Sequence, residues 1–153
     1  MKITDLKCAV IGNSPVVRIL TDEGLYGHGQ IEESKPYVKP QVLFYRDLIL
    51  GQDPTDVERV MLNIRRMGAF KPWGSAVSAI EMALWDIAGK AAGVPVYKLL
   101  GGKIRNKVRA YLTGGSSIPG SQPEDCAARV KEVKALDEGY TITKQAVAFH
   151  SGM

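Results

Sequence analysis

The feature that most constrains the fold of this chain is a run of small and apolar residues, 79–105, which also contains residues that end a helix. Apolar side chains recur at the spacing of a helix with one buried face: Ala76, Ile80, Ala83, Leu84, Ile87 and Ala91. Gly93 and Pro95 end that helix, and a short apolar turn at residues 96–100 follows. The sequence therefore predicts a buried helix over residues 74–92. Its small residues allow neighbouring elements to approach closely: Ala79, Ala83, Ala88 and Ala91.

The first fifty residues predict three strands and then a helix. Apolar-rich runs at residues 2–11, 15–21 and 25–32 are separated by two turn-forming triplets, which favours an antiparallel meander. Residues 37–50 then carry apolar positions at helical spacing and end at Gly51.

A further helix is predicted over residues 57–67, before the long one. Thr55 and Glu58 have the spacing of a capping box, and Asp53 is a rival cap for the same helix. Three strands followed by three helices indicate an α+β domain.

From residue 107 the pattern changes to strand, helix, strand. Residues 108–113 predict a strand, a helix follows a capping box at residues 121–124 and continues to Glu138, and residues 140–148 predict a second strand. A helical crossover implies that the two strands are parallel. Two such strands alone would leave long unpaired edges, so we expect the beginning of a larger barrel.

Charge and composition exclude several classes of function. The net charge is +4, and the basic residues are scattered without interleaved aromatics, so nucleic-acid binding is not expected. No apolar run approaches the roughly 20 residues needed to span a bilayer, and we do not expect the first residues to form a secretory signal. Cys8 and Cys126 form no metal or redox spacing, which predicts reduced thiols in a cytoplasmic protein.

The ordered string of residues 79–105 closely resembles the hinge segment of the enolase superfamily, in its mandelate racemase and muconate lactonizing branch. The resemblance extends over nearly the whole chain. It implies an α+β capping domain at residues 1–106 and the first β-α-β of an incomplete (β/α)8 barrel at residues 107–153. It also implies a Mg²⁺-dependent, homo-oligomeric enzyme that removes the proton α to the carboxylate of a small carboxylate or sugar-acid substrate.

The same resemblance places the family's three metal carboxylates on the third, fourth and fifth barrel strands, which this chain does not contain. We therefore expect no metal ligand within the chain, and no activity from the 153 residues alone.

Residues 139–146 resemble the family's second barrel strand, where two basic residues commonly occur as Lys-x-Lys. Lys144 matches the first of them and could contact the substrate carboxylate, but Ala146 stands in the second position. This departure favours a one-base reaction, the dehydration of a sugar acid. A racemase or epimerase, a cycloisomerase and a noncatalytic truncated fragment remain alternatives. His150 could act as acid, base or hydroxyl-binding group. The alternative for Lys144 is a surface lysine near a strand end, and the alternative for His150 is an exposed loop histidine.

In relatives, two loops of the capping domain select the substrate. The first corresponds to residues 12–15 with 30–34, and the second to residues 66–73. Arg66, Lys71 and Trp73 could recognise an anionic, hydroxylated ligand. The alternative is a polar loop whose tryptophan anchors the next helix.

Three other polar residues are expected to be structural. His28 lies between two glycines, but the spacing of a phosphate-binding loop is absent, so the glycines are predicted to allow close packing. Glu81 and Asp86 are five residues apart and do not share a helix face. Asp86 is instead predicted to pair with Lys90, with Arg105 as a possible third member.

Overall fold

The computed structural model describes residues 1–66, 74–113 and 123–144. Contacts within the chain divide it into two compact units, Met1–Lys103 and Ile104–Met153, each of which is described by itself. Among the described helices, none is both long and apolar enough to cross a membrane.

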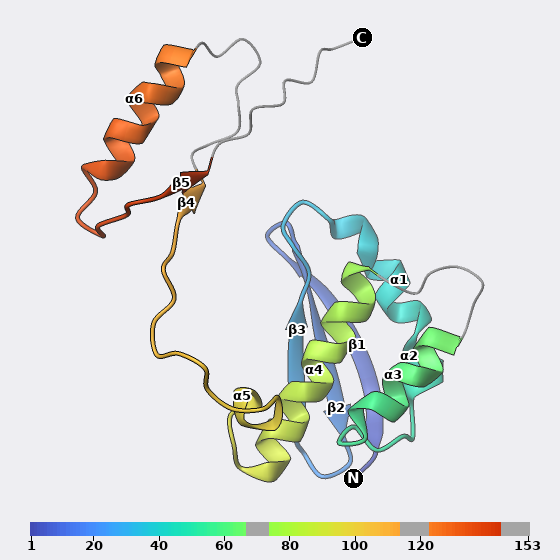
Figure 1. The fold of residues 1–153 in the computed structure, drawn as a ribbon. Helices are drawn as coiled ribbons and strands as arrows, with labels where there is room; N and C mark the ends of the chain where they lie inside the picture. Colours follow the sequence, from blue (N-terminus) through green and yellow to red (C-terminus); the bar gives the residue numbers. More distant parts are fainter. Residues whose placement is uncertain (67–73, 114–122, 145–153) are drawn as a thin grey trace. The chain divides into compact units, whose positions relative to one another are not determined.

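The first unit is built on a three-stranded antiparallel sheet in the order β1-β2-β3 (Figure 1). The strands are β1 (Ile3–Ile11), β2 (Ser14–Thr21) and β3 (Tyr26–Gln30), which confirms the predicted meander. Gly12 and Gly24 lie in the two turns with φ of +60° and +81°, a conformation that favours glycine. Inward residues alternate with outward ones along β2 and β3, as a sheet covered on one face requires.

The segment predicted as one helix over residues 37–50 forms three short pieces instead. They are η1 (Pro36–Val38), α1 (Lys39–Phe44) and α2 (Arg46–Ile49). Pro40 has no amide hydrogen to bond to a preceding turn, so the chain restarts its helix at Lys39. Tyr45, with ψ of −4°, separates α1 from α2. Leu43, one of the apolar positions of this segment, is exposed.

Helix α3 (Val57–Arg66) forms as expected, but its start is organised differently. Asp53 accepts hydrogen bonds from the amide and the hydroxyl of Thr55, at 2.9 and 2.7 Å. Glu58 pairs with Arg65 at 3.3 Å. Both members of the predicted capping box are thus engaged elsewhere, and the rival residue, Asp53, orders the turn that precedes the helix.

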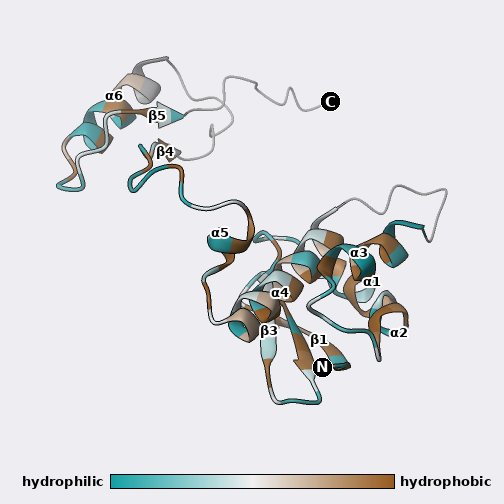
Figure 2. Ribbon diagram, turned by 60° about the horizontal axis from the view of Figure 1, so that its bottom comes forward, coloured by the Kyte–Doolittle hydropathy of each residue, from teal (hydrophilic) through white to brown (hydrophobic). Residues whose placement is uncertain are grey.

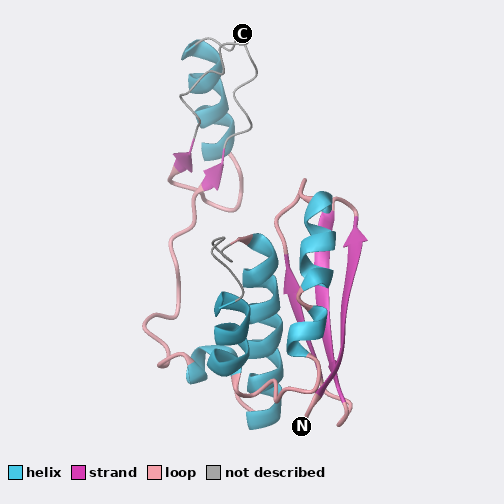
Figure 3. Cartoon of the chain, turned by 90° about the vertical axis from the view of Figure 1, so that its right-hand side faces the viewer, coloured by secondary structure: helices cyan, strands magenta, loops and turns pink. Residues whose placement is uncertain are grey.

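Helix α4 (Ser75–Ala92) lies against β3 and β2, while α3 packs on α4 and α1 lies beside β1 (Figures 1 and 3). It ends at Gly93, whose φ is +66°, as the sequence predicts. A Cβ atom built on Gly27 or Gly29 of β3 would lie only about 2 Å (2.0 and 1.9 Å) from the carbonyl oxygens of Ala83 and Ala79. The glycines around His28 therefore allow α4 to touch the strand backbone, which confirms their predicted packing role.

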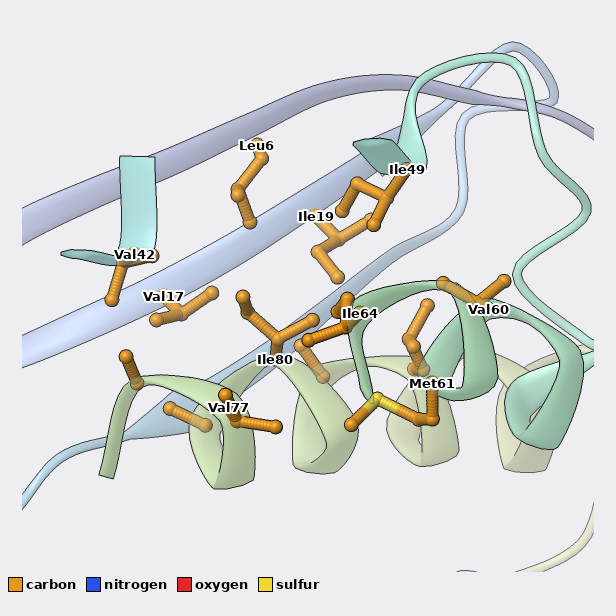
Figure 4. Packing of buried hydrophobic residues seen from close by; sticks show 14 of the residues in the cluster. Leu6, Val17, Ile19, Val42, Ile49, Val60, Met61, Ile64, Val77 and Ile80 are labelled. Carbon is orange, nitrogen blue, oxygen red and sulfur yellow. The ribbon is translucent and has the colours of Figure 1, made fainter. Parts of the chain in front are cut away.

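The core of the first unit lies between the sheet and α3 and α4 (Figure 4). Its largest fully buried side chains come from all of these layers and include Leu6, Ile19, Met61, Ile64, Ile80 and Leu84. Helix α3 carries both strongly polar and strongly apolar residues, and its buried positions are the apolar ones (Figure 2). In α4 the predicted small-residue positions are buried except Ala91, which is exposed in the last turn.

After α4 the chain forms α5 (Val96–Leu99), at the predicted apolar turn. The second unit contains β4 (Leu112–Thr113), α6 (Pro123–Lys134) and β5 (Thr143–Lys144), with β4 and β5 parallel as predicted. The helix ends four residues before the predicted Glu138, because residues 135–138 form turns closed by a bond from the Gly139 amide to the Leu136 carbonyl. Within the described residues each strand is also much shorter than predicted.

Candidate functional site

The end of β3 and the start of α4 bring three polar side chains together, which we call the Glu32 cluster: Glu32, Lys35 and Ser75. The Ser75 hydroxyl donates to one carboxylate oxygen of Glu32 at 2.6 Å, and Lys35 Nζ lies 2.5 Å from the other. Lys35 Nζ also lies 3.5 Å from Ser75 Oγ. A loop after a strand and the first turn of a long helix thus present a carboxylate, an ammonium and a hydroxyl at one point.

The Glu32 carboxylate is ionised at every physiological pH. Hydrogen bonds from Lys35 and Ser75 lower its pKa to about 2, from an ordinary 4.5. The bond to Glu32 in turn raises the pKa of Lys35. The Glu32 side chain is nevertheless 59% exposed, so a ligand can reach it.

A pocket of about 500 Å³ opens beside this cluster. Its walls combine polar and apolar side chains: Gln30, Ile31, Glu32, Ser75, Ser78 and Met82. The volume is in the range of small-molecule sites. An amide, two hydroxyls and a carboxylate can donate to or accept from the hydroxyl groups of a small polar ligand.

The backbone holds the two segments of the predicted first loop together. The Ile31 amide donates to the Pro15 carbonyl at 2.9 Å, and the Ser34 amide donates to the Asn13 carbonyl at 3.2 Å. Ser34 adopts a φ of +68°, which is uncommon for a residue with a Cβ atom. The turn at residues 12–15 thus fixes the path of the chain as it leaves β3.

Of the residues predicted to bind substrate, the structure describes Arg66, an exposed residue at the end of α3. Lys71 and Trp73 lie outside the described residues, so their roles stay predictions.

In the second unit, Lys144 is the last residue of β5 and is exposed. It stands opposite Thr113 of the parallel strand β4, so the last described residues of the two strands lie at the same edge of this small sheet. In barrel enzymes, catalytic groups occupy that edge. Ala146 and His150 lie outside the described residues.

The two helix carboxylates make separate contacts, as their spacing predicts. Glu81 lies 3.6 Å from Arg65 of α3, whereas Asp86 pairs with Lys90 at 2.8 Å. Asp86 also accepts the backbone amide of His28. Arg105 belongs to the second unit. Within residues 1–66, 74–113 and 123–144, no three His, Cys, Asp or Glu side chains are grouped so that they could hold a metal ion.

Sequence reasoning did not single out the Glu32 cluster. Glu32 and Lys35 are three residues apart, so their pairing could have been suspected if the segment had been predicted to turn. Ser75 is 43 residues away from Glu32 and carries no local signal.

Residues 10–101 match the family model described as mandelate racemase / muconate lactonizing enzyme, N-terminal domain. The D-galactonate dehydratase of Pectobacterium atrosepticum is 38% identical over 125 residues, which cover 78% of this chain and 32% of that protein. The D-galactonate dehydratase of Verminephrobacter eiseniae is 35% identical over 147 residues, covering 92% and 37%. The chain therefore spans about a third of the length of these relatives.

Solved structures give the same result. A mandelate racemase/muconate lactonizing enzyme-like protein from Rubrobacter xylanophilus superposes with a TM-score of 0.81 at 31% identity, covering 98% of this chain and 43% of that one. An enolase from Agrobacterium radiobacter, crystallised with bound Na and L-malate, gives a TM-score of 0.79 at 28% identity, covering 95% and 38%.

Proposed function

The chain belongs to the mandelate racemase / muconate lactonizing enzyme family, and from this premise we propose that it forms the N-terminal part of a sugar-acid dehydratase. In this proposal residues 1–106 are the capping domain and residues 107–153 begin the catalytic barrel. The observation that carries the proposal is the match to two D-galactonate dehydratases across the capping domain and into residues that follow it.

The proposed reaction removes water from a sugar acid. A base takes the proton α to the carboxylate, and a general acid protonates the hydroxyl on the next carbon, which leaves as water. The resulting enol then transfers its hydroxyl proton, through solvent, to that next carbon and becomes a 2-keto-3-deoxy acid. The α proton is weakly acidic, so negative charge that develops on the carboxylate side must be stabilised where it forms. In family enzymes a divalent ion, which we propose is Mg²⁺, supplies part of that stabilisation.

The described residues do not fit a metal site, so we assign none of them as a metal ligand. Lys144 is proposed to contact the substrate carboxylate, because its ammonium stands at the strand edge where catalytic groups of barrels occur. Arg66, Lys71, Trp73 and His150 remain candidates for substrate contacts on the sequence pattern alone.

The pocket beside Glu32 is proposed to receive the hydroxylated part of the substrate. Its amide, hydroxyl and carboxylate groups match the alternating donors and acceptors of a polyol.

The test is to express the protein from its natural coding DNA, measure the mass of the product, and assay D-galactonate with Mg²⁺ for 2-keto acid. We expect keto acid to form, and Lys144→Met to lower kcat/KM at least about tenfold, as the loss of one charged hydrogen bond in the transition state would. Lys134→Met, at the exposed end of α6, is the matched control and should leave the rate unchanged.

Running the assay in D₂O separates the alternatives. Deuterium entering the recovered sugar acid without any keto acid would identify a racemase or epimerase and contradict the dehydratase. Absence of both keto acid and exchange, over a panel of sugar acids, would contradict the whole proposal.

A further inference from the structure

We propose that Glu32 is an internal anion that makes this pocket accept the neutral hydroxyl end of a sugar monoacid and exclude the second carboxylate of a sugar diacid. The inference rests on the proposed function in so far as the ligand is a sugar acid. It adds a substrate class and names the residue that sets it.

Glu32 lies beside the start of helix α4. Its carboxylate accepts the hydroxyl of Ser75, the first residue of the 18-residue helix α4. The start of a helix carries partial positive charge and is a favourable place for an anion. Glu32 places a carboxylate of the protein itself beside this helix start, through its bond with the Ser75 hydroxyl.

Lys35 carries an ammonium group that could otherwise bind a ligand carboxylate. It lies 2.5 Å from Glu32 and 3.5 Å from Ser75 Oγ, so its charge is directed into the cluster. Lys35 is not among the residues that line the pocket, whereas Glu32 is. The Glu32 carboxylate therefore forms part of the pocket wall, and the Lys35 ammonium does not.

The charge of the pocket lining also favours a neutral group of the ligand. Apart from Glu32, the described lining residues are uncharged: Gln30, Ile31, Ser75, Ser78 and Met82. Hydrogen bonds from Lys35 and Ser75 hold the pKa of Glu32 at about 2. Glu32 therefore stays ionised at neutral pH, also when a second carboxylate of a ligand approaches it. The second carboxylate of a sugar diacid would be repelled by the negative charge of Glu32, whereas a hydroxyl of a sugar monoacid can donate a hydrogen bond to it.

The experiment measures binding, so that it does not depend on turnover. The ¹⁵N-labelled chain is titrated with D-galactonate, with galactarate and with the uncharged polyol galactitol, and the amide shifts of Gln30, Glu32, Ser75 and Ser78 are followed. We expect galactonate and galactitol to shift these amides with affinities within about threefold of each other, and galactarate to bind about tenfold more weakly.

Two variants test the cause. Glu32→Gln should bring the affinity for galactarate to that for galactonate or above it, because Lys35 is then released to bind a carboxylate. Lys35→Met should widen the difference, because Glu32 loses its counter-charge. Asp47→Asn, which removes a highly exposed carboxylate of α2 outside the pocket, should leave the ratio unchanged.

Equal binding of galactarate and galactonate to the unmodified chain would overturn the inference. So would an unchanged ratio in Glu32→Gln with a well-dispersed spectrum, or the absence of shifts from all three ligands. A failure of the proposed reaction is recognised separately, because it would appear as missing keto acid while the binding preference persists.

Discussion

The carboxylate of Asp86 in α4 accepts a hydrogen bond from the backbone amide of His28 in β3 at 3.0 Å, across 58 residues of sequence. The same oxygen lies 2.8 Å from Lys90 Nζ, and that ammonium also donates to the Tyr26 carbonyl at 2.7 Å. Burial by itself raises the pKa of Asp86, but the bonds from Lys90 and His28 lower it more, so the net pKa lies below the ordinary value.

Replacing Asp86 by alanine should destabilise the first unit. Hydrogen bonds to a charged group contribute about 1.5–3 kcal/mol, and since the Asp86 side chain is 34% exposed we expect a loss of about 1–2 kcal/mol in the free energy of unfolding. Urea unfolding followed by circular dichroism measures it. Asp47→Ala, at a side chain that is 90% exposed, should change stability by less than about 0.5 kcal/mol. Equal losses in the two variants would contradict the role given to Asp86.

Gly29→Ala tests the contact between β3 and α4. The new methyl group would lie 1.9 Å from the Ala79 carbonyl oxygen, so strand and helix must move apart, and we expect a loss of at least about 3 kcal/mol or no folded protein. Gly12→Ala is the matched control, because its methyl group meets open space and suffers only from the φ of +60°, which costs about 1–2 kcal/mol. The prediction fails if the two variants unfold at the same urea concentration.

The carboxyl group of Glu32 should titrate near pH 2 in a ¹³C-detected NMR experiment. Because its folded pKa lies below its ordinary 4.5, the stabilisation it provides is complete above pH 4.5 and is lost as the pH falls toward 2. Ser75→Ala and Lys35→Met should each raise this pKa, since each removes one hydrogen bond to the carboxylate. Lys7→Met, on β1, should not change it. A wild-type midpoint near 4.5 would show that the cluster does not form in solution.

The thiol of Cys8 should be unreactive in the folded chain. Burial raises its pKa and keeps it protonated, and the thiolate is the reactive form. In a Cys126→Ser background, we expect a disulfide reagent to modify Cys8 at least about a hundredfold more slowly than in 6 M guanidinium, because reaction requires unfolding. Rapid modification without denaturant would contradict the buried position.

Elements whose signal is local could be predicted from the sequence. The three strands follow from apolar alternation and turn triplets, and α4 from its helical period with Gly93 at its end. The prediction of one helix over residues 37–50 was wrong because an apolar period registers neither the missing amide of Pro40 nor the break at Tyr45. The capping box at Thr55 was wrong because Asp53, two residues earlier, competes for the Thr55 hydroxyl.

The site was harder to predict, because its contacts join distant segments. Residues 30–34 could be named as a substrate loop only through the family resemblance. That Glu32 binds Ser75 depends on how α4 lies against β3, which in turn depends on Gly27 and Gly29. The sequence shows these glycines and the alanines of α4, but not that they face each other.

The bonds from Asp86 and Lys90 to β3 also bear on the solubility of the chain. Among the strands that the structure describes, β3 pairs with β2 alone, so the other side of β3 would present free backbone N–H and C=O groups to another extended segment. Two of those groups, the His28 amide and the Tyr26 carbonyl, are already occupied by side chains of α4. A foreign strand would have to break both bonds before it could add to the sheet, which guards this domain against aggregation.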